Sequence, residues 1–138
     1  MHQTHSLKPR GVGLHHVALR AVDFDASLRF YTAGLGFQPT LQFEEDGVTV
    51  ALLDTGNGTY IELFGGGTGT QAEGAIFHFA LHTDDCAVAV ERARAAGARI
   101  IVEPTDAELV GDTVVPVRYA FCAGPDGEQI EFLQSAYL

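Results

Sequence analysis

Basic residues are scarce in this chain of 138 residues. Eight Lys and Arg stand against eighteen Asp and Glu, which gives a formal net charge of −10 at pH 7. Phosphate backbones and anionic lipids repel such a surface, so the composition argues against nucleic acid and membranes as partners. No apolar run approaches the roughly 20 residues of a membrane helix, and the N-terminal residues lack the apolar core of a signal peptide. We therefore expect neither a membrane span nor a targeting signal.

Cysteine is also rare, with Cys86 and Cys122 as the whole set. Two cysteines cannot build a disulfide framework, and their wide separation does not resemble a metal knuckle. Neither has a histidine beside it in sequence, so nucleophilic cysteine catalysis is not expected. The cysteine usage fits a reducing compartment, and we expect a cytoplasmic protein. A hydrophobic content of 46% at this length predicts one globular domain.

What the chain does contain is an internal repeat. The segment 16–19 (HVAL) recurs 62 residues later as 78–81 (HFAL), and 60–64 (YIELF) resembles 129–133 (QIEFL). Each half therefore opens with a histidine segment and closes with a glutamate segment. We predict a single domain, 1–138, of two tandem modules, about 13–64 and 75–134. The glycine-rich residues 65–74 join them, with a composition that suits a flexible connector.

Each module is predicted to fold as β-α-β-β-β, which gives an α+β protein with a curved mixed sheet. In module one, Asp23 or Asp25 caps a helix through Ala33, and Gly34 ends it in the left-handed conformation. The strands expected in this module are 14–22, 38–43, 48–54 and 59–64. In module two, Asp84 or Asp85 caps a helix over 86–96, which Gly97 ends. The first strand of module two is expected to begin at 78. Further strands are expected over 99–103, 117–123 and 128–133, with an irregular excursion over 104–115.

Four polar residues occupy equivalent places in the two modules. Strand alternation puts His16 and His78 on equivalent faces, while Glu62 and Glu131 are mid-strand carboxylates between apolar neighbours. Unpaired buried carboxylates are costly, and two of them meeting at one point would repel each other unless a cation lay between them. We therefore predict a site for one divalent metal. Two imidazoles and two carboxylates suit Zn, Ni, Co, Fe or Mn.

Other polar residues are expected around this site or away from it. Arg20 and His82 each follow a predicted ligand histidine by four residues, so they are expected on the same face at the pocket rim. Arg20 is the candidate clamp for an anionic substrate group, because its planar fork donates two hydrogen bonds. Tyr60 shares the face of Glu62 and is expected to line the pocket. His15 is expected to point to the helix side of its strand, and the remaining histidines, His2 and His5, are expected to be solvated.

These segments resemble the vicinal oxygen chelate superfamily over 14–133. The resemblance rests on 14–20 (LHHVALR), 30–31 (FY) followed by 34–37 (GLGF), 61–63 (IEL), and 124–127 (GPDG) leading to 130–132 (IEF). It implies the glyoxalase/bleomycin resistance/dioxygenase fold of paired β-α-β-β-β modules. The ligand order His16, Glu62, His78, Glu131 is similar to that of glyoxalase I. The asparagine that such enzymes place four residues after the first metal glutamate is Gly66 here.

The resemblance implies a metal-dependent lyase or isomerase acting on a small substrate that chelates the metal through two neighbouring oxygens. Glu62 and Glu131 would move the proton, in an order that the sequence leaves open. Alternatives are a non-haem iron extradiol-type dioxygenase, an epimerase of the same superfamily, and a non-catalytic protein that binds a small drug. Members of this superfamily commonly pair modules, so we expect a homodimer. The sequence does not say whether the four ligands meet within one chain or across two.

Overall fold

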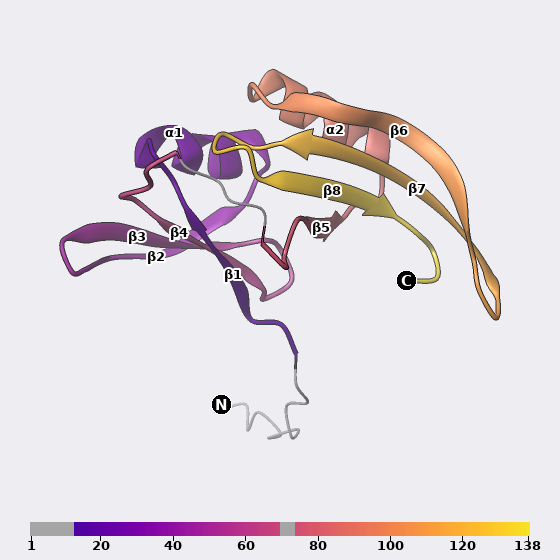
Figure 1. Ribbon diagram of the computed structural model, residues 1–138, viewed down its shortest axis with the longest axis horizontal. Coiled ribbons are helices and arrows are strands. Elements are labelled where there is room, and N and C mark those ends of the chain that lie inside the picture. Colours follow the sequence, from indigo (N-terminus) through magenta and orange to yellow (C-terminus); the bar gives the residue numbers. More distant parts are fainter. Residues whose placement is uncertain (1–12, 70–73) are drawn as a thin grey trace, which may run out of the picture.

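The computed structural model describes residues 13–69 and 74–138. These residues form an α+β fold of two four-stranded sheets, each accompanied by a helix (Figure 1). The first sheet has the order β1-β4-β3-β2 and consists of β1 (His16–Arg20), β2 (Gln38–Glu45), β3 (Val48–Asp54) and β4 (Tyr60–Phe64). The second has the order β5-β8-β7-β6 and consists of β5 (Phe79–His82), β6 (Arg99–Val110), β7 (Val114–Ala123) and β8 (Gln129–Gln134). The sheets share one topology, as the repeat predicts.

The first strand of each module pairs in parallel with the strand that carries the glutamate of that module. His16 is the first residue of β1, and His78 directly precedes β5. In the first sheet Ala18 lies opposite Glu62, and in the second Ala80 lies opposite Glu131. The other strand pairs are antiparallel. Since the side chains of a strand alternate between faces, each histidine and glutamate come to the same face of their sheet.

Both helices begin at the aspartates that the sequence suggests. Asp23 caps α1 (Phe24–Arg29) by accepting from the Ala26 N–H at 3.0 Å. Asp85 caps α2 (Cys86–Ala95) by accepting from the Val88 N–H at 3.1 Å. Each carboxylate satisfies one of the amides left free at a helix N-terminus. The aspartate caps are confirmed, and the choice falls on Asp23 and Asp85.

The end of the first helix differs from the prediction. A π-helical turn, η1 (Phe30–Gly34), continues α1, and the left-handed residue is Gly36, with φ of 85°. The prediction that Gly34 stops the helix in a left-handed conformation is therefore wrong. A Cβ on Gly34 would lie 2.6 Å from the Ala96 Cβ, so this glycine allows the end of η1 to touch the end of α2.

The predicted excursion 104–115 is wrong as well. Strand β6 runs without a break to Val110, and β7 resumes at Val114, so the two form a long hairpin that extends beyond β8 (Figure 1). The register of β6 against β7 shifts twice, between Ile100 and Val102 and between Val102 and Thr105. Such bulges interrupt the period of two by which a strand is recognised from sequence. The other strand ends differ from the prediction by a few residues.

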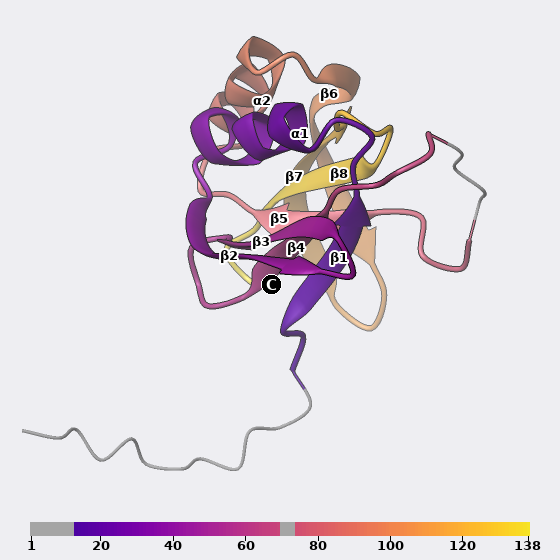
Figure 2. The ribbon, with the colours of Figure 1, turned by 90° about the vertical axis from the view of Figure 1, so that its left-hand side faces the viewer.

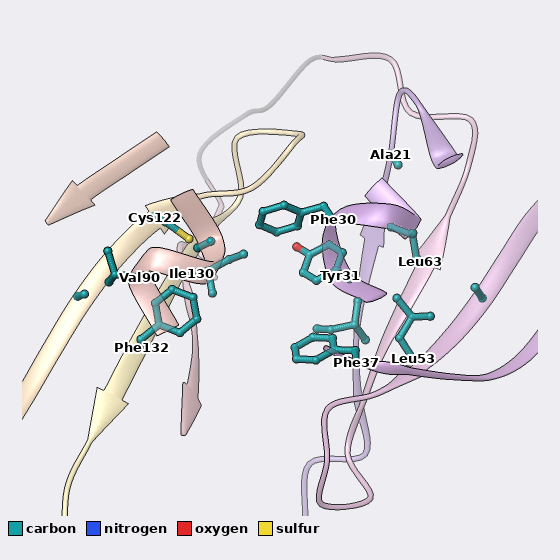
Figure 3. Close-up of a cluster of buried hydrophobic side chains, with 14 of the residues drawn as sticks. Ala21, Phe30, Tyr31, Phe37, Leu53, Leu63, Val90, Cys122, Ile130 and Phe132 are labelled. Carbon is teal, nitrogen blue, oxygen red and sulfur yellow. The ribbon is translucent and has the colours of Figure 1, made fainter. Parts of the chain in front are cut away.

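The hydrophobic core lies between the modules. Buried side chains of module one, among them Tyr31 and Phe37, face Ile130 and Phe132 of module two (Figure 3). The two helices lie side by side on one side of the molecule, with the strands below them (Figure 2). The neighbours of each glutamate are buried in this core, namely Ile61, Leu63, Ile130 and Phe132. Because side chains alternate along a strand, Glu62 and Glu131 lie on the face of their sheet that points away from the core.

The described part of the connector packs onto module one. Gly67 donates its N–H to the Ala21 carbonyl at 2.9 Å, and a Cβ on Gly67 would lie 2.8 Å from the Ala21 carbonyl carbon. Glycine is needed here because the two backbones touch. Residues 70–73 of the predicted connector lie outside the described residues, as do His2 and His5.

Candidate metal centre

The first His–Glu pair lies on the sheet of module one. His16 Nε2 is 3.8 Å from Glu62 Oε1, and their side chains are 41% and 19% exposed. Parallel pairing of β1 with β4 sets this spacing, because Glu62 stands opposite Ala18, two residues beyond His16 on the same face. The prediction that these two side chains share a face agrees with this geometry.

The second pair repeats the arrangement on the other sheet. His78 Nε2 is 3.5 Å from Glu131 Oε2, and the side chains are 30% and 19% exposed. His78 lies directly before β5, and Glu131 stands opposite Ala80, two residues further along. The equivalent strands of the two modules therefore present the same nitrogen and oxygen donors.

The fold keeps the two pairs apart within one chain. Over residues 13–69 and 74–138, no three or more His, Cys, Asp and Glu side chains come together as a metal ion requires. Each pair lies on the face of its sheet that points away from the core shared by the modules. One chain thus presents two half-sites, each with one imidazole and one carboxylate.

The donors of each half-site fit a divalent ion. Two ligands held about 2.1 Å from one metal lie roughly 3 to 3.5 Å apart, and the observed separations of 3.8 and 3.5 Å are close to this. Imidazole nitrogen with carboxylate oxygen is a donor set for Zn, Ni, Co, Fe or Mn. Two donors hold a metal weakly, so a complete centre needs both half-sites.

His15 does not lie where the sequence predicts. Its ring contacts His16, with the two Nδ1 atoms 3.0 Å apart, and lies 5.1 Å from the Tyr60 ring. Tyr60 is on the same face of β4 as Glu62, so His15 joins the half-site and is not on the helix side. The prediction failed because β1 begins at His16, and strand alternation does not extend to the residue before it.

Phe121 is a neighbour of the second half-site that sequence reasoning missed. It stands opposite Glu131 in the β7–β8 pair, and its ring centroid is 5.3 Å from that of His78. The tight turn at Gly124–Gly127 fixes this register, so the sequence contains the information needed to place Phe121. Pairing the strands outward from that turn places Phe121 on the glutamate's face.

The three predicted substrate residues, Arg20, Tyr60 and His82, lie in different parts of the fold. Tyr60 is half-buried and adjoins His15 and His16 through the start of β4. Arg20 is exposed at the far end of β1, on the face of His16 by alternation. His82 is exposed and lines a cleft between the modules, together with Asn57 and Arg92.

The two cysteines are buried away from this chemistry. Burial raises the pKa of the Cys86 thiol. Burial also raises the pKa of Cys122, to about 11, with a smaller contribution from the negative charge of Glu128. Thiols with raised pKa values are protonated and unreactive near neutral pH. The expectation that neither cysteine is a nucleophile agrees with this burial.

Known proteins share both the sequence pattern and the fold. The pattern that defines the Glyoxalase/Bleomycin resistance protein/Dioxygenase superfamily matches residues 13–132. A lactoylglutathione lyase of Haemophilus influenzae is 32% identical in an alignment of 127 positions that covers 87% of this chain and 90% of the lyase. A 2-epi-5-epi-valiolone epimerase of Actinomyces is 27% identical over 91% of this chain and 80% of the epimerase.

A solved structure gives the same result for the fold. The trypanothione-dependent glyoxalase I of Leishmania major superposes with a TM-score of 0.68 and 26% identity, covering 90% of this chain and 87% of that one. Among the helices of the described residues, none is long and apolar enough to cross a membrane. The paired sheets and the matched pattern together show that this chain belongs to the Glyoxalase/Bleomycin resistance protein/Dioxygenase superfamily.

Proposed function

We propose that this protein is a metal-dependent lyase or isomerase of the glyoxalase I type, which moves a proton on a small substrate with two neighbouring oxygens. The observation that carries the proposal is the repeated half-site, with His16 and Glu62 on one sheet and His78 and Glu131 on the other. Its support from relatives is the similarity to a lactoylglutathione lyase over most of both chains.

The proposed centre is assembled from two copies of the chain, as a homodimer. Within one chain the pairs lie on faces that point away from the common core, so the pairs need a second copy to meet. Apolar side chains beside the histidines remain exposed, with Leu14 at 73%, Ile76 at 85% and Phe77 at 70%. An apolar rim around a polar half-site is typical of a surface that another chain covers.

The two glutamates are the proposed proton carriers. A divalent ion held by the two histidines and two glutamates would make a C–H beside a carbonyl more acidic, because it would stabilise the negative charge that develops. One of Glu62 and Glu131 would remove this proton, and the other, protonated from solvent, would give a proton to the neighbouring carbon. Their side chains are 19% exposed, so water still reaches the carboxylates and solvent deuterium can enter the product.

Arg20 is proposed to bind an anionic group of the substrate from the end of β1. Its guanidinium is exposed on the face that carries His16, where two parallel hydrogen bonds to a carboxylate can form. Tyr60 is proposed as a further pocket residue, whereas His82 lines the cleft between the modules. Gly66, which has φ of 75° and no side chain, stands where glyoxalase I commonly has an asparagine. Thiols other than glutathione are therefore included among the proposed substrate adducts.

An epimerase is the second candidate, because one relative carries that name at 27% identity. The same two glutamates would then return the proton to the carbon it left. Solvent deuterium uptake distinguishes the outcomes when followed by NMR with methylglyoxal adducts of glutathione and other small thiols, hydroxy-ketones, CoA thioesters and catechols. Uptake with migration of the carbonyl supports the isomerase, and uptake with inversion supports the epimerase. Oxygen consumption without uptake would replace both with a dioxygenase, and tight binding without turnover would indicate a binding protein.

Mixing two inactive variants tests the shared centre. His16→Ala and His78→Ala should each lose tight metal binding and activity alone. If each centre joins module one of one chain to module two of another, random pairing restores about a quarter of the wild-type centres. Metal analysis and turnover of the mixture give the result. A mixture as inactive as its components, with dimers shown by sedimentation, would place each centre within one chain. Sedimentation of a monomer alone would contradict the homodimer.

A further inference from the structure

The ring of His15 is held in a definite place beside His16. Its Nδ1 lies 3.0 Å from the Nδ1 of His16, and the two rings meet edge to face at 85°. The His15 ring also lies against Tyr60, with centroids 5.1 Å apart, and its carbonyl accepts from the Tyr60 N–H at 2.9 Å. His15 is thus anchored to β4 by both its backbone and its ring.

This contact involves the nitrogen of His16 that faces away from Glu62. Nε2 of His16 points to the glutamate, at 3.8 Å, and Nδ1 points to His15. A neutral imidazole carries one proton, on one of its two nitrogens. If Nδ1–H of His16 donates to His15, then Nε2 of His16 is left with a free lone pair directed at the half-site.

We propose that His15 is a positioning residue that accepts the Nδ1–H of His16, and so fixes the tautomer and ring orientation in which Nε2 is the donor atom of module one. Its role toward a metal rests on the proposed function, whereas the hydrogen bond itself does not. Imidazole ligands commonly need such a partner on the second nitrogen, because it sets the tautomer and raises the basicity of the ligand.

Within the described residues, module two shows no counterpart of this hydrogen bond. The residue 62 positions after His15 is Phe77, whose ring meets His78 edge to face with centroids 4.9 Å apart. Phe121 contacts His78 in the same manner, at 5.3 Å. Two phenyl rings restrict the position of an imidazole but accept no conventional hydrogen bond from it. The sequence repeat therefore supplies a matched substitution, His15→Phe, which gives module one the flank of module two.

The test reads the His16 tautomer in metal-free protein. Long-range ¹H–¹⁵N correlation spectra of ¹⁵N-histidine-labelled protein, recorded at about pH 8.5, where unperturbed imidazoles are neutral, should show His16 protonated on Nδ1. His15→Ala and His15→Phe should lose this preference. His15→Asn should retain it, because its side-chain oxygen can accept the same hydrogen bond. Glu44→Gln, at an exposed position on β2 away from both half-sites, is the control and should leave His16 unchanged.

Titration with Zn²⁺ or Ni²⁺ provides a second reading. We expect His15→Ala and His15→Phe to bind the metal about 10- to 100-fold more weakly than wild type, as other losses of a ligand's partner do, and His15→Asn to recover most of this. An unchanged His16 tautomer in His15→Ala would overturn the inference. So would a changed tautomer with unchanged metal affinity. If the wild type bound no divalent metal, the proposed function would fail, and the tautomer of His16 would still decide whether His15 orients it.

Discussion

The two modules carry the same His–Glu pair in different surroundings. In module one, His16 touches the polar ring of His15, which is held by Tyr60. In module two, His78 lies between the rings of Phe77 and Phe121. The separations of imidazole from carboxylate remain similar, at 3.8 and 3.5 Å. The backbone pairing alone therefore sets the donor spacing, and the flanking side chains are free to differ.

The hairpins beside the two half-sites also differ in length. In module one, β2 and β3 are joined by Asp46 and Gly47, both with positive φ, in a two-residue turn that suits the twist of the strands. In module two, the β6–β7 hairpin continues to Val110 and Val114, whose side chains are 77% and 55% exposed. The repeat keeps the strand order and varies the periphery.

The largest expected effect tests whether the two carboxylates act together. Glu62→Gln and Glu131→Gln each keep an oxygen donor and remove the proton acceptor. We expect turnover of the working substrate to fall by about 100-fold or more in both variants, as general-base losses do, while metal affinity falls far less. Steady-state kinetics with metal titration provide the measurement. A large loss in one variant alone would assign the proton transfer to one module and leave the other with a ligand only.

Arg20→Ala is the control for that comparison. Since Arg20 is proposed to hold an anionic part of the substrate, its loss should raise KM with less effect on kcat. An equal fall in kcat and kcat/KM would instead show that Arg20 makes an interaction that forms only in the transition state.

The contact between the modules predicts a smaller effect, on stability. Gly34 and Ala96 are equivalent positions of the repeat, and a Cβ on Gly34 would lie 2.6 Å from the Ala96 Cβ. Gly34→Ala should destabilise the protein by about 1–3 kcal/mol, the usual range for overpacking. Ala96→Gly in the same chain should recover most of the loss, because it makes room on the other module. Chemical denaturation of both single variants and the double variant gives the coupling. A Gly34→Ala protein as stable as wild type would show that the modules can move apart.

Most of the fold could be predicted because its determinants are local. Asp23 and Asp85 each cap a helix three residues before the amide they bind, and a repeat of histidine and glutamate segments indicates a repeat of strand order. The role of Gly34 could not be predicted, since the residue it accommodates is Ala96, in the other module. The long β6 strand was missed because its bulges break the alternation.

The candidate site was predictable to the level of the two pairs. Alternation along β1, β4, β5 and β8 is enough to bring each histidine to the face of its glutamate. The ring contacts of His15 and Phe121 depend on where a strand begins and on cross-strand register, which a periodic pattern does not specify. The proposed meeting of the two half-sites depends on contact with a second chain, and no local pattern contains that information.

The smallest predicted effect concerns the turns before the two glutamate strands. In module one, among residues 13–69 and 74–138, the side chains of Asp54 and Asn57 bond only within their own turn, to Thr55, Gly56, Gly58 and Thr59. In module two, Asp126 reaches across to module one, accepting from the Val22 N–H at 2.9 Å and from Ser27 Oγ at 3.0 Å. The Asp126 N–H in turn donates to Glu128 at 3.0 Å. This turn therefore joins the modules, and the Glu128 carboxylate holds the turn by accepting the Asp126 N–H.

Burial raises the pKa of Glu128, and the nearby Asp126 adds to the increase. A raised pKa means that the fold favours the protonated carboxyl, so its contribution to stability is complete at acid pH and is lost as pH rises through the folded-state pKa. Glu128→Gln is neutral at every pH and keeps the oxygen that accepts from Asp126. We expect its melting temperature to exceed that of wild type, by little near pH 4 and by most near pH 8. Glu44→Gln, at an exposed position on β2, should show no such trend. If the Glu128→Gln advantage stayed constant from pH 4 to 8, the Glu128 carboxyl would not be destabilised by its burial, and the turns of the two modules would differ only in their hydrogen bonds.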